Sequence, residues 1–236
     1  QIQTYIYQYI LRNVFKISHK VYLKTKIKSS IPNKKTYLTK SDFPLIIDKP
    51  GVYVLKEDIL FDKMLPQGKF PTGPFAGIII KSNRVILDLN GFTISQSDWH
   101  ASFFRFFSII ELMDWPFSKN NGGIFAPKNP TTSTNYCIIK NGTIGRSTHF
   151  GIHGNNNSLI WIKNLLIKDF EVAGISLNFV TGLIVEDVNI GPSTKNVLVN
   201  QHFTQLCAGF FLSNKNSEIK KEIKAVLKEI KNTGEI

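Results

Sequence analysis

The sequence has few cysteines and no long apolar run, and these two features exclude several classes of protein. Only Cys137 and Cys207 occur among 236 residues, so a disulfide-rich scaffold and a zinc site with four cysteine ligands are excluded. No stretch of 18 apolar residues is present, which excludes a typical membrane-spanning helix. Hydrophobic residues still make up 42% of the chain. We therefore expect a folded protein with a large core rather than a disordered one.

Acidic residues are missing from the first 40 positions, and this absence locates most of the net charge. The whole chain carries +12, and residues 1–40 contribute +9 of it through eight Lys and Arg12. Residues 41–214 carry only +1. An excess of positive charge favours polyanionic partners, but here only the terminal segment has that excess.

The middle of the chain repeats with a period of 23 residues. Asn141, Asn164 and Asp187 are separated by 23 positions each, and Ile144, Ile167 and Ile190 follow them at a constant offset. Between these positions apolar residues alternate with polar ones, which is typical of β-strands. We therefore predict an all-β fold, a short parallel β-helix of about five coils. In this fold Asn141, Asn164 and Asp187 form a polar ladder at one corner, and Lys163 and Glu186 form an ion pair.

The predicted organisation has three parts. Residues 1–44 form a basic N-terminal arm, residues 45–214 the β-helix, and residues 215–236 an amphipathic helix. An insertion at about 96–134 interrupts the β-helix. It contains a cluster of aromatic residues that either packs on the solenoid or forms a patch for a partner. The candidates for this patch are Trp99, Phe103, Phe107 and Trp115.

Two segments carry a resemblance to a known superfamily. Residues 85–94, Val-Ile-Leu-Asp-Leu-Asn-Gly-Phe-Thr-Ile, and residues 137–144, Cys-Ile-Ile-Lys-Asn-Gly-Thr-Ile, resemble the opening coils of right-handed β-helix proteins of the pectin-lyase-like superfamily. Residues 106–112, 149–155 and 170–175 resemble a narrower group of β-helix proteins from large DNA viruses and algae. The resemblance implies a right-handed solenoid. It also implies a place in a virion or in the host cytoplasm.

The superfamily includes polysaccharide lyases, glycosidases, epimerases and non-catalytic surface proteins, so the side chains must indicate the function. A glycosidase needs two neighbouring carboxylates, but in the predicted register no acid lies beside another acid. His149 and His153 are candidates for a general base or a metal ligand, or for corner histidines that bond to the backbone. Asp169 and Glu171 are candidates for a calcium-assisted elimination, and Asp169 alternatively forms an ion pair with Arg146.

The leading hypothesis is therefore a non-catalytic structural or recognition module that contacts glycans or other protein subunits. The alternative is a carbohydrate-active enzyme, a lyase or glycoside hydrolase, with its site near His149, His153, Asp169 and Glu171. We predict neither a cofactor nor a dedicated metal site for the leading hypothesis.

The basic arm allows three interpretations. Spacings of three and four residues predict a helix over the first 17 positions, and alternation predicts a strand over residues 21–28. In the first, its lysines contact nucleic acid. In the second, they dock on another protein. In the third, the arm caps the first coil, and its lysines form a face that is exposed to solvent. The lysines in question are Lys20, Lys24, Lys26 and Lys28.

Overall fold

The computed structural model describes residues 20–62, 75–104, 106–115 and 131–191. The chain divides into two compact units, residues 1–195 and 196–236, and every described residue belongs to the first. The helices predicted over the first 17 residues and over 215–236, and Cys207, lie outside the described residues. None of the helices among the described residues is long and apolar enough to cross a membrane.

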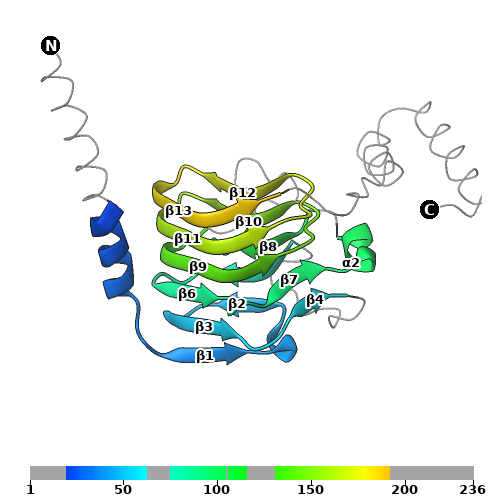
Figure 1. The fold of residues 1–236 in the computed structure, drawn as a ribbon, viewed down its shortest axis with the longest axis horizontal. Coiled ribbons are helices and arrows are strands. Elements are labelled where there is room, and N and C mark those ends of the chain that lie inside the picture. The colour runs from blue at the N-terminus through cyan, green and yellow to red at the C-terminus, as the bar shows by residue number, and fades with distance from the viewer. Residues whose placement is uncertain (1–19, 63–74, 105, 116–130, 192–236) are drawn as a thin grey trace, which may run out of the picture. The chain divides into compact units, whose positions relative to one another are not determined.

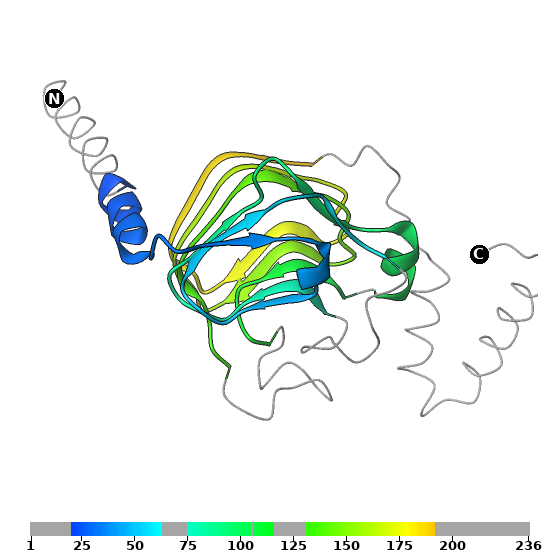
Figure 2. The same cartoon turned by 90° about the horizontal axis from the view of Figure 1, so that it is seen from below.

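The described strands form two parallel sheets that face each other across one core (Figures 1 and 2). Sheet A has eight strands in the order β1-β3-β6-β9-β11-β13, and β4 joins it through β7, which pairs with β9. Its strands are β1 (Lys35–Leu38), β3 (Gly51–Leu55), β4 (Ile59–Phe61), β6 (Val85–Asp88), β7 (Thr93–Gln96), β9 (Asn135–Ile144), β11 (Ser158–Ile167) and β13 (Thr181–Ile190).

Sheet B has five strands in the order β12-β10-β8-β5-β2. They are β2 (Leu45–Ile47), β5 (Ala76–Ile80), β8 (Ser108–Glu111), β10 (Phe150–Asn155) and β12 (Ala173–Asn178). A 3-10 helix, η1 (Lys40–Asp42), and an α-helix, α2 (Asp98–Phe103), complete the numbered elements. The chain alternates between the two sheets, so residues far apart in sequence become neighbours within each sheet.

The predicted fold class, an all-β parallel β-helix solenoid, is wrong. The described residues form separate parallel sheets of eight and five strands with a few helical segments, an α/β-like arrangement, and not a closed solenoid. The 23-residue period has a simpler meaning. It gives the register of neighbouring parallel strands, for example Ile160 opposite Leu183 and Ile162 opposite Val185. Connections of constant length between successive strands of one sheet produce this register, and they do so without closing the strands into coils. The 23-residue period therefore could not decide the fold class.

The part of the chain that we predicted to be an insertion also belongs to the fold. Residues 108–111 form β8, which lies between β5 and β10 in sheet B. All four residues of β8 are buried. The alternating pattern did not reveal this strand, because it has only four residues, with the two apolar ones between Ser108 and Glu111, and they do not alternate with polar ones.

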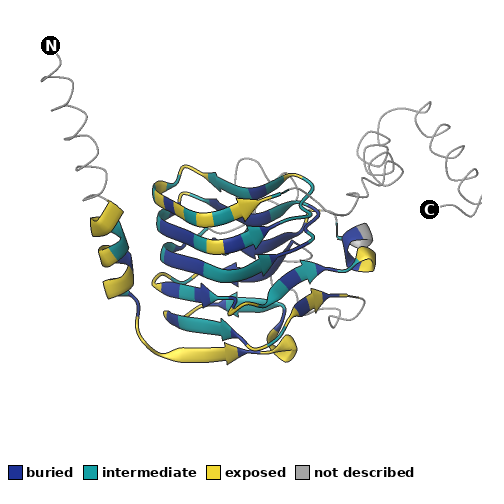
Figure 3. Cartoon of the chain, in the orientation of Figure 1, coloured by how far each residue is buried: buried dark blue, intermediate teal, exposed yellow. Residues whose placement is uncertain are grey.

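Aliphatic side chains from both sheets fill the core between them. Ile78, Ile110 and Ile152 from sheet B and Leu87, Ile139 and Ile162 from sheet A are fully buried there. Figure 3 shows this pattern, with buried segments along the inner strands and exposed ones on β1 and the last strand, β13. Burial of one such side chain stabilises the fold by roughly 1.5–3 kcal/mol.

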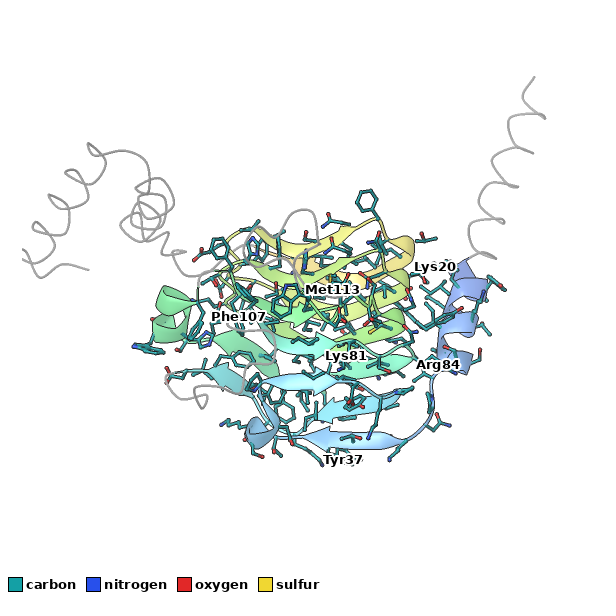
Figure 4. The ribbon with its side chains drawn as sticks, turned by 180° about the vertical axis from the view of Figure 1, so that it is seen from behind. Lys20, Tyr37, Lys81, Arg84, Phe107 and Met113 are labelled. Carbon is teal, nitrogen blue, oxygen red and sulfur yellow. The ribbon has the colours of Figure 1, made fainter. Side chains whose placement is uncertain are left out.

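A helix covers part of the outer face of sheet A, where we predicted a strand. Residues 20–30 are helical, and Figure 4 labels Lys20 at the start of this segment. Ile27 and Ile31 pack on Trp161 of β11 in a second apolar cluster, with Ile138 and Ile184 beside it. A strand with the predicted alternation would bury Val21 together with Ile27, but Val21 is 56% exposed. The buried residues Ile27 and Ile31 are four positions apart, which is the spacing of one face of a helix.

A polar ladder runs along one corner of sheet A. Asn141 and Asn164 have positive φ angles of 61° and 50°, a conformation that Asn tolerates better than most residues. Asn164 Nδ2 donates to Asn141 Oδ1 at 3.0 Å, and Asn141 Nδ2 donates to Asp88 Oδ1 at 3.0 Å. Asp187 has the same backbone conformation, with φ 52°, but its carboxylate has no N–H to donate to Asn164.

Candidate functional site

A groove lies where four neighbouring strands of sheet A end. β4, β7, β9 and β11 are adjacent and parallel. Residues of β4 and β7, together with residues that follow the carboxyl ends of all four strands, line a hollow of about 550 Å³. We call it the strand-end groove. Its volume is in the range of small-molecule sites, and the carboxyl ends of parallel strands are where such sheets commonly bind ligands.

The strand-end groove combines charged, hydroxyl and aromatic side chains. Trp99 of α2 is 37% exposed and contributes an indole surface. Arg146 donates to Asp98 at 2.5 Å between Nη1 and Oδ1. The full lining is Leu60, Asp62, Thr93, Ser95, Gln96, Ser97, Asp98, Trp99, Gly145, Arg146, Lys168 and Asp169.

Ser97 holds one side of the groove in place. Its Oγ accepts a hydrogen bond from the backbone N–H of His100 at 3.1 Å and thereby caps α2. The same hydroxyl donates to Asp62 Oδ1 at 2.8 Å. One residue therefore joins the end of β4 to the start of the helix that carries Trp99, and the positions of Asp62 and Trp99 are coupled.

The floor behind the groove is a hydrogen-bonded network. Gln96 accepts from the backbone N–H of Thr148 at 2.7 Å and donates to Nδ1 of His100 at 2.8 Å. His100 is buried and packs against the rings of Phe104 and Phe107. Burial lowers the pKa of His100 to about 4, although the charge of Asp62 opposes this effect.

Of the four residues that we predicted as a catalytic cluster, only Asp169 lines the strand-end groove. His149 and His153 lie close together outside it, because both pack on the ring of Phe150, at 3.8 and 4.7 Å between ring centres. Trp99, which we predicted as part of a partner patch, lies in the groove with Asp169. Arg146 forms its ion pair with Asp98, where we predicted Asp169. His149 and Glu171 flank a turn in which Glu171 N–H donates to Ser147 O at 3.0 Å.

His153 has a partner that the sequence pattern did not identify. Its Nδ1 lies 2.9 and 2.8 Å from the two carboxylate oxygens of Glu111. Glu111 is 42 residues away in sequence and fully buried. A lone acid in an apolar strand was the available signal, since a buried carboxylate requires a partner.

The predicted aromatic patch does not form one surface. Phe107 is fully buried and belongs to the core between the sheets. Trp115 is half-buried, and Trp99 lies in the groove. Phe103 ends α2, and its side chain lies outside the described part of the chain.

Most of the lysines on the helix of residues 20–30 face sheet A. Lys20 and Lys24 contact Glu186 Oε1 at 3.0 and 2.7 Å, and these hydrogen bonds lower the pKa of Glu186 to about 2. The predicted pair between Lys163 and Glu186 is wrong, because Lys20 and Lys24 contact Glu186, whereas the Lys163 ammonium lies over the Trp161 ring, 4.7 Å from its centre. Lys28 contacts the same ring at 5.4 Å, and Lys26 contacts Tyr22.

The described residues bring together few side chains that could bind a metal ion. Among the residues that the structure describes, no group of three or more His, Cys, Asp or Glu side chains could hold a metal ion. The His153–Glu111 pair has only two such groups. The groove has three carboxylates, and Arg146 engages that of Asp98.

Comparison with known proteins corrects the resemblance to the pectin-lyase-like superfamily and to viral and algal β-helix proteins. The segments on which it was based are short strands with Asn-Gly turns, and such strands also occur in the two parallel sheets seen here. No family model matches the chain, and neither a curated protein nor a solved structure matches it.

Proposed function

We propose that this protein is a saccharide-recognition module and that the strand-end groove binds the glycan. The observation that carries the proposal is the exposed indole of Trp99 beside Arg146, Lys168 and three Asp side chains in a groove of about 550 Å³. A sugar ring presents an apolar C–H face and a rim of hydroxyls. The indole provides a flat apolar surface for the face, and the charged side chains provide donors and acceptors for the rim.

The polar side chains of the groove are held in place before a ligand arrives. Asp98 is fixed by Arg146, and Asp62 is fixed by Ser97. Such preorganisation reduces the ordering cost of binding. These contacts engage the carboxylates of Asp62 and Asp98, which favours recognition over cleavage of the glycosidic bond.

The test is a glycan array probed with the full chain, followed by calorimetry with the glycan that binds best. We expect Trp99→Ala to weaken binding about 5- to 150-fold, since stacking on one aromatic ring contributes about 1–3 kcal/mol. Phe179→Ala is the matched control, because Phe179 is 85% exposed and lies outside the groove. It should leave the affinity unchanged.

Two results would contradict the proposal. One is the absence of any bound glycan, or equal affinity of the wild-type protein and Trp99→Ala. The other is release of reducing ends from the bound glycan that stops in Asp169→Asn, because the protein would then be a glycoside-cleaving enzyme.

A further inference from the structure

Three polar residues lie in one row across sheet B, outside the strand-end groove. Glu111 of β8, His153 of β10 and Ser176 of β12 are in register on adjacent strands. Their chain neighbours Ile110, Ile152 and Ile175 are also in register and pack in the core. Since successive side chains of a strand alternate between its faces, the three polar residues share the opposite face of the sheet.

The pair at one end of this row has a defined geometry. Glu111 is fully buried, His153 is 6% exposed, and both carboxylate oxygens lie within 2.9 Å of His153 Nδ1. Phe150 stacks on the imidazole at 4.7 Å with an interplanar angle of 11°. The carboxylate and the aromatic ring together fix the orientation of the imidazole and favour the tautomer that carries its proton on Nδ1.

The remaining nitrogen of His153 points away from Glu111. Glu111 on β8 engages Nδ1, so Nε2 is the ring nitrogen left for a partner on another element. The hydrogen bonds that His153 makes to Glu111 both involve Nδ1 and leave Nε2 to the rest of its surroundings. Ser176 on β12 is half-buried and stands opposite His153 in the parallel register. Neighbouring strands lie about 4.7–4.9 Å apart, so the serine hydroxyl and the imidazole are neighbours on the same face of the sheet.

We propose that Glu111, His153 and Ser176 form an acid–base–nucleophile relay that hydrolyses carboxylic esters. The order of the three groups across the sheet is the one that nucleophilic catalysis by serine requires. The site is distinct from the strand-end groove, so this activity is additional to saccharide recognition.

The reaction balances with water as the only co-reactant. Ser176 Oγ attacks the ester carbonyl carbon while His153 Nε2 takes the hydroxyl proton. The C–O bond to the leaving alcohol breaks, and Nε2 returns the proton to that oxygen. Water then attacks the acyl-serine, His153 again transfers the proton, and the carboxylic acid and free Ser176 are released. Glu111 remains ionised and stabilises the imidazolium in both steps.

The test uses a fluorophosphonate probe and p-nitrophenyl acetate on the full chain. We expect covalent labelling of Ser176, located by peptide mass spectrometry, and none in Ser176→Ala. We expect His153→Asn to slow labelling and ester hydrolysis by about 100-fold or more. The control is Ser82→Ala, which removes another half-buried serine and should label at the wild-type rate.

A second variant protects the test against misfolding. Glu111→Gln keeps an acceptor for His153 Nδ1 but removes the charge, and we expect slower labelling with an unchanged circular dichroism spectrum. Failure of the folded wild-type protein to label at Ser176, or equal labelling of wild type, His153→Asn and Glu111→Gln, overturns the proposal. Ser176→Ala should retain glycan affinity, so failure of this proposal is distinguishable from failure of the proposed function.

Discussion

At the residue scale, His100 shows how one hydrogen bond determines the protonation of a buried side chain. The amide of Gln96 is oriented by Thr148 N–H and by Phe104 O, so its Nε2 must donate to His100 Nδ1. A protonated His100 would direct a second donor at the same amide. Burial and this donor both favour the neutral imidazole.

The protein should therefore lose stability in mild acid. The pKa of His100 is lowered to about 4 in the folded state, and the usual histidine value is 6.5. Between these values the unfolded chain binds a proton that the folded chain does not, so the free energy of unfolding falls as the pH decreases from 6.5 to about 4. Urea denaturation at several pH values measures this slope.

His100→Gln should flatten part of that slope, because it removes one of the groups responsible. Burial and the nearby His153 also lower the pKa of His149 to about 4, so the double variant with His149→Gln should be flatter still. Identical pH dependence in the wild-type protein and both variants would show that these histidines do not control the acid transition.

At the element scale, the helix of residues 20–30 binds sheet A through two kinds of contact. Ile27 is fully buried against the cluster around Trp161. Lys20 and Lys24 reach Glu186 at the surface. Exposed ion pairs contribute about 0–1 kcal/mol, whereas truncation of a buried Ile costs about 2–5 kcal/mol. The apolar contact therefore dominates the attachment of this helix.

Ile27→Ala should release the helix, and Glu186→Gln should not. We expect limited proteolysis with trypsin to cleave near Lys24 much faster in Ile27→Ala than in the wild-type protein. Glu186→Gln should change the cleavage rate little. The difference from the wild-type protein should be smaller still at high salt, because salt screens the ion pairs of the wild-type protein. A larger effect of Glu186→Gln would mean that charge holds the helix. Ser29→Ala, at an exposed position of the same helix that is not a trypsin site, serves as the control.

At the scale of the whole molecule, one core joins the two sheets, and Cys137 lies within it. Cys137 is fully buried on β9, which pairs with β6, β7 and β11. Burial raises the pKa of its thiol to about 12. Reagents need the thiolate and access to it, and the folded protein provides neither.

Cys137 should therefore report global unfolding. In a Cys207→Ser background, we expect a thiol reagent such as dithionitrobenzoate to leave Cys137 unmodified in the folded protein at pH 8. Modification should appear with urea over the same range as the loss of circular dichroism signal. Rapid modification without denaturant would instead show that sheet A opens locally near β9.

Part of this structure was predictable from the amino-acid sequence, since the 23-residue spacing correctly pairs Lys163 with Glu186 in the strand register. The same spacing did not show which side chains interact across that register. Glu186 bonds to Lys20 and Lys24 from a helix that the alternating pattern had indicated as a strand. Register follows from local periodicity, whereas side-chain partners depend on which element packs on the face of the sheet.

The alternation of core and surface positions, the Asn corners with positive φ, and the register of β9, β11 and β13 could be read from the amino-acid sequence. These features follow from local backbone preferences and the constant spacing of residues. The arrangement of the strands in two sheets, the groove around Trp99 at four strand ends, and the contact between Glu111 and His153 became visible only in the folded chain. Those contacts join residues far apart in the chain, and they form because packing both sheets on one core outweighs the entropy lost in bringing these residues together.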